Sequence, residues 1–413
     1  MLGLLVASML SFVDSGQEPE RLGEGLIISL VTFGPGEEIS YWWGHSALVV
    51  DDTQGRTRLL YNYGMTDFSS AFVLDFLKGR MKFWVAETDA VVETYEQYKG
   101  HNRDVRIQEL NLTPTQRVVL AKALADNALP QNRDYLYHHY NDNCSTRPRD
   151  LIDKALGGQL LKASAAPARM SLRDHTRRYT RVSAVASLVL DYLQNDELDR
   201  PITRREEAFL PDELERQLSE LKVVAADGSL QPAVVRQTKF FTSSLPAVPY
   251  DAPRWPLQLL LAGSSLGGLG FLLSRTDRKG GRAPRIAWGL TNALLGLGFG
   301  VLSTLGFVLG TFTDNQVTHL NENLLVMSPL SLALLPLGVM RCLGSARARA
   351  GIRWTWTLLL ATGVAGILLK ALPMFDQANW NVILLVLPIT GAMTAATWLD
   401  HRADRARKGR AVS

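Results

Sequence analysis

Cys144 is the residue in this sequence whose type and setting best suit covalent chemistry. It is one of only two cysteines in 413 residues, and it stands in "YNDNCSTRPRD" (Tyr140–Asp150), where a helix is predicted to begin. Backbone N–H groups at a helix N-terminus lack partners within the helix, and with the helix dipole they stabilise negative charge on sulfur or on an oxyanion. The position predicts a thiol nucleophile. An inert, buried cysteine is the alternative.

A nucleophilic thiol needs a base, and His45 is the best candidate. It lies in the strand-like segment "WGHSALVVDD" (Trp43–Asp52), where a rigid element would fix the ring and Gly44 permits a close approach. His45 is therefore predicted to take the thiol proton.

The other histidines of the charged half are less suited to that role. His138 and His139 lie near Cys144 in sequence, so one of them can reach the same site. His101 lies in the polar turn "YKGHNRD" and His175 in "RDHTRRY", and both are predicted to be surface residues.

A third group usually orients the base of such a site, and Asn62 is the candidate. It lies in "LLYNYG" on the next predicted strand, where alternation turns Tyr61 and Tyr63 to the other face. Asn143 can cap the helix or donate to an oxyanion. The predicted orienting or oxyanion groups are thus Asn62, Asn143 and Tyr63, and the predicted substrate contacts are Trp43, Ser46, His139, His319, Asn321 and Asn323.

No metal or cofactor site is predicted. The sequence has no HExxH or CxxC motif and no His/Asp cluster at ligand spacing. It also lacks a P-loop, a Rossmann glycine pattern and a GxSxG motif. The predicted chemistry therefore depends on side chains alone.

The elements that must position these residues lie in a charged half that ends near Arg254. Strands are predicted at Gly25–Gly36, Trp43–Asp52, Thr57–Gly64, Met81–Asp89 and Asp104–Leu112. Helices are predicted over Thr113–Leu129, with Thr113 as its cap, and around "PRDLIDKALGG", closed by Gly157 and Gly158. This order is typical of an α+β domain with a small antiparallel sheet and helices on one side. The segment Ser171–Phe241 is predicted to be helical.

The second half of the sequence consists of long apolar runs, each near the roughly 20 residues that cross a bilayer as a helix. The five predicted spans are Trp255–Ser274, Ile286–Phe312, Leu324–Leu343, Trp354–Pro373 and Val382–Leu399. The sequence therefore predicts an all-α bundle of five transmembrane helices.

Lysine and arginine in the short loops set the predicted orientation. Arg275–Arg285, Arg341–Arg353 and the tail His401–Arg410 are basic, whereas Thr313–Asn323 and Met374–Asn381 contain neither residue. The basic loops should be cytoplasmic, which places the N-terminal half outside the membrane. The net charge of +4 then reports topology and not nucleic-acid binding. Cys144 and Cys342 would lie on opposite sides, so they cannot form a disulfide with each other.

The predicted domains follow from these patterns. They are a signal-like apolar segment (1–15), a catalytic thiol domain (20–165), a helical extension of the exported domain (166–241), a Pro-rich linker (242–254), the transmembrane domain (255–400) and a basic cytoplasmic tail (401–413).

Three spaced motifs resemble the Lnb family of bacterial lipoprotein N-acyltransferases. They are "WGHSALVV", "LLYNYGMTDF" and "YNDNCSTRPRDLID", in the family's order; "FLPDEL" and "THLNENLLVMSPLSL" extend the resemblance. The resemblance implies a Cys/His thiol site related to NlpC-type peptidases and lecithin:retinol acyltransferase, in the permuted, papain-like arrangement where the histidine precedes the cysteine. Cys144 matches the family's nucleophile and His45 its base.

The activity implied by the resemblance is acyl transfer at a bacterial inner membrane. Cys144 would take a fatty acyl group from a phospholipid as a thioester and pass it to the N-terminal amine of a diacylglyceryl-cysteine lipoprotein. The partners implied are membrane lipids, the phospholipid donor and the diacylated lipoprotein acceptor. Two alternatives stay open: a tethered cysteine peptidase or amidase that acts on cell-wall peptides, and an envelope scaffold with an inert Cys144.

Overall fold

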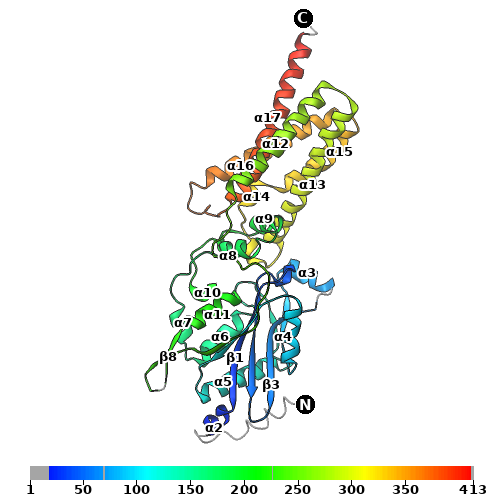
Figure 1. Cartoon of the computed structure of the whole chain (residues 1–413). Helices are drawn as coiled ribbons and strands as arrows, with labels where there is room; N and C mark the ends of the chain where they lie inside the picture. Colours follow the sequence, from blue (N-terminus) through cyan, green and yellow to red (C-terminus); the bar gives the residue numbers. More distant parts are fainter. Residues whose placement is uncertain (1–17, 68–69, 226, 411–413) are drawn as a thin grey trace. The chain divides into compact units, whose positions relative to one another are not determined.

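The computed structural model describes residues 18–67, 70–225 and 227–410 (Figure 1). The apolar segment predicted at residues 1–15 lies outside the described residues. The chain forms two compact units, Met1–Leu172 with Pro201–Val248, and Arg173–Arg200 with Pro249–Ser413. Arg173–Arg200, inside the predicted helical extension, thus belongs to the unit that holds the apolar helices.

A seven-stranded antiparallel sheet organises the first unit, with strand order β6-β4-β3-β2-β1-β5-β9. The strands are β1 (Leu26–Phe33), β2 (His45–Asp52), β3 (Thr57–Met65), β4 (Lys82–Thr88), β5 (Val105–Leu110), β6 (Asp134–Leu136) and β9 (Val234–Phe241). The helices are α2 (Glu18–Glu24), α3 (Ser70–Lys78), α4 (Val91–Gly100), α5 (Pro114–Ala128), α6 (Thr146–Ala155), α7 (Gln159–Ala163), α10 (Arg204–Glu207) and α11 (Pro211–Glu220). A separate hairpin joins β7 (Lys222–Val224) and β8 (Leu230–Pro232). The α+β class is confirmed.

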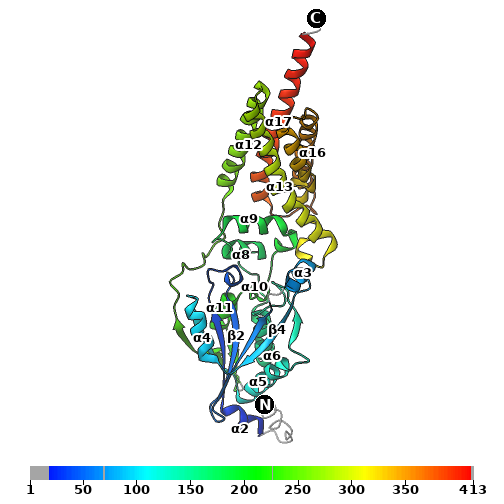
Figure 2. The ribbon, with the colours of Figure 1, turned by 90° about the vertical axis from the view of Figure 1, so that its right-hand side faces the viewer.

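Helices cover both faces of the sheet, which corrects the predicted one-sided cover. Helices α5, α6 and α11 pack on the face that carries Leu30 and Leu48. Helix α4 packs on the opposite face, where Val91 and Tyr95 meet Val31 (Figure 2). Val91 and Tyr95 are four residues apart and form one apolar stripe, so a short polar helix still has a face to bury.

The stretch Lys222–Phe241 forms β7, β8 and β9 and is not helical as predicted. Strand β9 pairs with β5 at the edge of the sheet, and Arg236 bonds Glu109 across the pair at 2.7 Å. Most of β9 is exposed. An edge strand buries little of either face, so its apolar alternation is weak and gives no clear period of two.

The second unit contains four helices long and apolar enough to cross a membrane, in the part of the chain that the structure describes. They are α12 (Pro256–Lys279), α13 (Arg282–Phe312), α16 (Arg347–Leu369) and α17 (Trp380–Arg410). A fifth crossing exists if the bent pair Gln316–Val326 and Pro329–Cys342, with 58° between its parts, is one span.

The predicted third span, Leu324–Leu343, is therefore not one continuous helix. It consists of α14 (Asn323–Val326), the 3₁₀ turn η4 (Pro329–Ala333) and α15 (Leu334–Cys342). Proline lacks the N–H that would continue α14, and the Ser328 hydroxyl caps the new start by accepting from Leu330 N at 3.2 Å.

Contacts within the second unit show that this bent segment runs from one end of the helices to the other. At one end, Lys370 Nζ donates to the Glu322 carboxylate at 2.8 Å, and the Gln377 backbone N–H donates to the same carboxylate at 2.9 Å. At the other end, Arg341 forms an ion pair with Asp277 at the end of α12. The basic loops thus gather at one end and the loops without lysine or arginine at the other, as alternating crossings require.

Candidate active site

His45 is fixed at the first position of β2, where the chain enters the sheet. Gly44 precedes it with a φ of +75°, and a side chain there would come within 2.9 Å of the Phe33 carbonyl oxygen. Glycine alone meets both conditions without strain. His45 pairs with Phe33 in the ladder, so a rigid strand holds the imidazole as predicted.

Asn62 of β3 bonds the imidazole directly. Its Oδ1 lies 2.5 Å from Nε2 of His45. Because an amide oxygen only accepts, Nε2 must carry the proton, which leaves Nδ1 as the ring nitrogen able to take a proton from a thiol. The ring of Tyr98 lies nearly parallel to the imidazole, with centroids 6.1 Å apart, and helps to fix its plane.

Gly64 is where the cysteine and the histidine meet. Its φ is +93°, next to a shift in the register between β3 and β4. A methyl group on Gly64 would lie 3.4 Å from Cβ of Cys144 and 3.7 Å from Cε1 of His45. The missing side chain therefore leaves one small space that both residues line. No thiol–imidazole hydrogen bond is present within the described residues, an open geometry common to catalytic pairs before substrate binds.

Asn143 caps α6 and so places Cys144 just before the helix. Its Oδ1 accepts from the backbone N–H groups of Ser145 and Thr146 at 2.8 and 2.9 Å. Its Nδ2 donates to the carbonyl oxygens of His139 and Phe209 at 2.6 and 3.0 Å. The structure thus shows the capping role for Asn143. The Asn143 amide and the N–H groups of Ser145 and Thr146 are engaged with each other and with these carbonyl oxygens, so their use to stabilise negative charge on sulfur stays a prediction.

Burial dominates the electrostatics of the pair. It raises the pKa of the Cys144 thiol to about 11, while the Ser46 backbone N–H and the Arg103 charge act in the other direction. Burial also lowers the pKa of His45 to about 4, against the bond to Asn62, and Arg103 lowers it further. At neutral pH the site therefore holds a neutral thiol and a neutral imidazole. Proton transfer must accompany attack, as in general-base catalysis.

Arg103 is a residue of this neighbourhood that the sequence did not reveal. Its side chain is 2 % exposed, and Nε donates to the Gly34 carbonyl oxygen at 2.8 Å. The guanidinium lies over the rings of Tyr41 and Tyr98, 4.4 and 4.7 Å from their centroids. It is the cation whose charge acts on both Cys144 and His45. No motif distinguishes an arginine in "YKGHNRD" from a solvated one.

Three of the predicted substrate contacts carry a buried polar atom without a hydrogen-bond partner among the described residues. These atoms are Nε1 of Trp43, Oγ of Ser46 and Nε2 of His139. The rings of Trp43 and His139 meet edge to face at 4.9 Å. Tyr63, a predicted orienting or oxyanion group, does have a partner, because its hydroxyl accepts a hydrogen bond from Nδ2 of Asn127 at 2.9 Å.

The other predicted contacts, His319, Asn321 and Asn323, belong to the second unit. Asn321 and Asn323 donate to the Tyr192 carbonyl oxygen at 2.7 and 3.0 Å. His319 bonds the Thr313 carbonyl oxygen at 2.9 Å. These bonds tie the outer loop to α9 (Ala184–Leu193) and to the end of α13, whereas a role in substrate contact stays a prediction.

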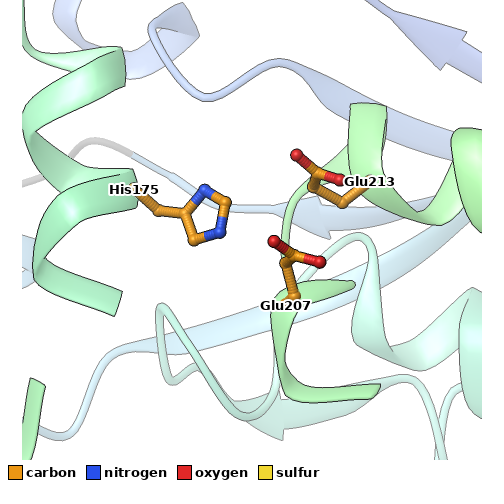
Figure 3. A group of neighbouring side chains, drawn as sticks. All are labelled: His175, Glu207 and Glu213. Atoms are coloured by element: carbon orange, nitrogen blue, oxygen red, sulfur yellow. The ribbon is translucent and has the colours of Figure 1, made fainter. Parts of the chain in front are cut away.

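Two acidic groups of the first unit share one arginine. The carboxylates of Glu207 and Glu213 lie near each other (Figure 3), and Nη2 of Arg216 is 3.3 and 2.7 Å from them. His175, also labelled there, belongs to the second unit. It is fully buried and bonds Arg178 at 2.8 Å, so the predicted surface position is wrong.

Carboxylates also gather within the second unit. Single oxygens of Asp196, Glu322 and Asp376 lie within 4.8 Å of one another. Lys370 donates to Glu322 there at 2.8 Å, so the protein supplies a cation of its own.

The fold and the site define a class of protein: an α+β domain in which a cysteine meets a histidine–asparagine pair, on a chain with membrane-length helices. The model of the family described as "Lnb N-terminal periplasmic domain" matches residues 24–179, which include Cys144, His45 and Asn62. Residues 24–179 are thus an Lnb N-terminal periplasmic domain, and four helices of membrane length, or five crossings if the bent pair is one span, follow it among the described residues. Searches of curated proteins and of solved structures returned no match.

Proposed function

We propose that this protein is an integral-membrane acyltransferase. It moves a fatty acyl chain from a phospholipid, through a thioester on Cys144, to the N-terminal amine of a diacylglyceryl-cysteine lipoprotein. The observation that carries the proposal is the meeting of Cys144 with the His45–Asn62 pair at Gly64, inside a matched Lnb domain. The membrane-length helices on the same chain suit a lipid donor and a lipid-anchored acceptor.

The proposed reaction has two half-reactions. Sγ of Cys144 attacks the ester carbonyl carbon while Nδ1 of His45 takes the thiol proton. The ester C–O bond then breaks, and the imidazolium returns its proton to the departing lysophospholipid alcohol. The acceptor amine next attacks the thioester carbonyl carbon and gives a proton to His45. The C–S bond then breaks, and His45 returns that proton to the departing thiolate of Cys144.

The proposed domain is a permuted relative of the NlpC-type thiol fold. In support, the strand that carries His45 precedes the helix that follows Cys144. The proposed topology places the basic ends of the membrane helices and the C-terminus in the cytoplasm, by the distribution of lysine and arginine.

The full-length protein, purified in detergent and returned to phospholipid vesicles, tests the proposal. The vesicles carry a phospholipid with a labelled acyl chain, and the acceptor is a diacylglyceryl-cysteine lipopeptide with a free amine. Wild-type protein should add one acyl chain to that amine. Cys144→Ala and His45→Ala should each abolish transfer. Cys342→Ala and His101→Gln are the matched controls and should keep it.

Transfer that persists in Cys144→Ala would refute the thioester route. A wild-type protein that forms the thioester yet gives the acyl chain only to water would refute the proposal that a lipoprotein amine is the acceptor. Release of peptide fragments from purified sacculi, without acyl transfer, would instead support the alternative function, a cysteine peptidase or amidase that acts on cell-wall peptides.

A further inference from the structure

Tyr135 presents a buried hydroxyl to the space between Cys144 and His45. Its Oη lies 4.0 Å from the point where a methyl group on Gly64 would sit, the same point that is 3.4 Å from Cβ of Cys144. Tyr135 is on the short strand β6 and pairs with Phe83 of β4, so the sheet fixes its backbone. The sequence around it gives no signal of this role, because β6 has three residues and carries no motif.

The Tyr135 ring is held on its other side by a fixed cation. The Arg147 guanidinium lies 3.8 Å from the ring centroid. Arg147 is itself fixed by Asp142, which accepts from Nε and Nη2 at 2.6 and 2.8 Å. A donor that is held this rigidly needs little reorganisation when charge develops beside it, which is the condition for electrostatic catalysis.

The hydroxyl of Tyr135 has no hydrogen-bond partner among the described residues, although it is buried. Leaving a buried hydroxyl unsatisfied costs about 1–3 kcal/mol, so the position favours a bound group that accepts from it. Neighbouring hydroxyls are already engaged: Tyr63 bonds Asn127, and Tyr137 bonds Nδ1 of His139 at 3.3 Å. Burial and the nearby Cys144 raise the pKa of Tyr135, so the phenol keeps its proton and remains a donor.

We infer that Tyr135 is a catalytic residue that donates a hydrogen bond to the acyl carbonyl oxygen as it becomes an oxyanion. The inference rests on the proposed thioester chemistry at Cys144. As Sγ forms its bond to the carbonyl carbon, the C=O π electrons move to oxygen, and the thiol proton goes to His45. The oxyanion then accepts from Tyr135 Oη and from the Ser46 backbone N–H, which already faces the Cys144 sulfur. Collapse restores the C=O bond and expels the alcohol.

The test compares two reactions of the same thiol in the full-length protein. Acylation by 4-nitrophenyl hexanoate passes through an oxyanion, and its rate is measured from the burst of nitrophenolate that it releases. Alkylation by iodoacetamide displaces iodide at a saturated carbon and forms no oxyanion. Tyr135→Phe should slow acylation by about 10²- to 10³-fold, the usual effect of one lost oxyanion donor, and leave alkylation within about threefold.

The matched control is Tyr61→Phe. It also removes a tyrosine hydroxyl from the same core, but the Tyr61 hydroxyl, unlike that of Tyr135, is already bonded to Glu87. It should change neither rate by more than about threefold. Equal slowing of acylation and alkylation by Tyr135→Phe would overturn the inference, since it would show an effect on the thiol itself. An unchanged acylation rate would also overturn it, as would a wild-type Cys144 that reacts with iodoacetamide but not with the ester.

Failure of the proposed function gives a different result. A wild-type protein that shows the burst, passes no acyl chain to the lipopeptide amine, and still depends on Tyr135 would refute the proposed acceptor while supporting the oxyanion donor.

Discussion

Gly64→Ala should leave a folded protein with little acyl transfer. The methyl group would make ordinary contacts, 3.4 Å to Cβ of Cys144 and 3.7 Å to Cε1 of His45, so no backbone atom must move. The φ of +93° is the main conformational cost, about 1–2 kcal/mol for a residue with a Cβ. For a unit of this size that lowers the melting temperature by roughly 2–8 °C. The same methyl group would occupy the small space that Cys144 and His45 both line, where the proposed reaction brings the acyl group.

The expected loss of acyl transfer is on the order of 10²-fold or more, as for other displacements of about 1 Å at a reacting centre. Transfer to the lipopeptide amine measures the activity, and thermal unfolding measures stability. Gly228→Ala is the matched control, because its φ is +80° and nothing lies within 4 Å of the added methyl group. It should lose similar stability and keep full activity. A folded Gly64→Ala protein with normal transfer would show that Cys144 and His45 do not react across this space.

Two further predictions follow from the site. Since the pKa of His45 is lowered to about 4, kcat/KM for the phospholipid donor should fall on the acid side with a midpoint near 4, as the base is protonated; a midpoint near 6.5 would contradict the neutral imidazole. Asn143→Ala removes the acceptor for two N–H groups at the start of α6 and the amide that donates to two carbonyl oxygens. The free energy of unfolding of the N-terminal unit, measured with denaturant, should therefore fall by about 1–3 kcal/mol, whereas Asn141→Ala at an exposed position should lower it by less than about 0.5 kcal/mol. Equal losses would mean that Asn143 does not hold the helix start.

The parts of the site that sequence could predict are those where local rules decide. His45 and Asn62 lie on neighbouring strands, and the period of two that predicts strands also puts these residues on one face. Cys144 stands next to a helix start that proline and serine residues mark. The positive φ of Gly44 and Gly64 explains why the first two motifs each carry a glycine within two positions of His45 or Asn62.

The parts that sequence could not predict depend on contacts between distant segments. Tyr135 reaches the site because β6 pairs with β4, about fifty positions earlier in the chain. Arg103 does so because its Nε bonds Gly34. The pKa of the Cys144 thiol also depends on burial, which a helix-start motif does not report. Long-range packing therefore determines both which groups surround the thiol and which protonation state it rests in.

The neutral resting state matters for the choice between an amine and water as acceptor. An imidazolium with a pKa near 4 is a strong acid, so in the proposed reaction His45 readily protonates the leaving alcohol and returns to its neutral form. The acyl-enzyme then presents a neutral base that can take the proton of an attacking amine. An amine with an ordinary α-amino pKa of about 7.7–8.0 is partly unprotonated near neutral pH, and in that form it is a better nucleophile than water.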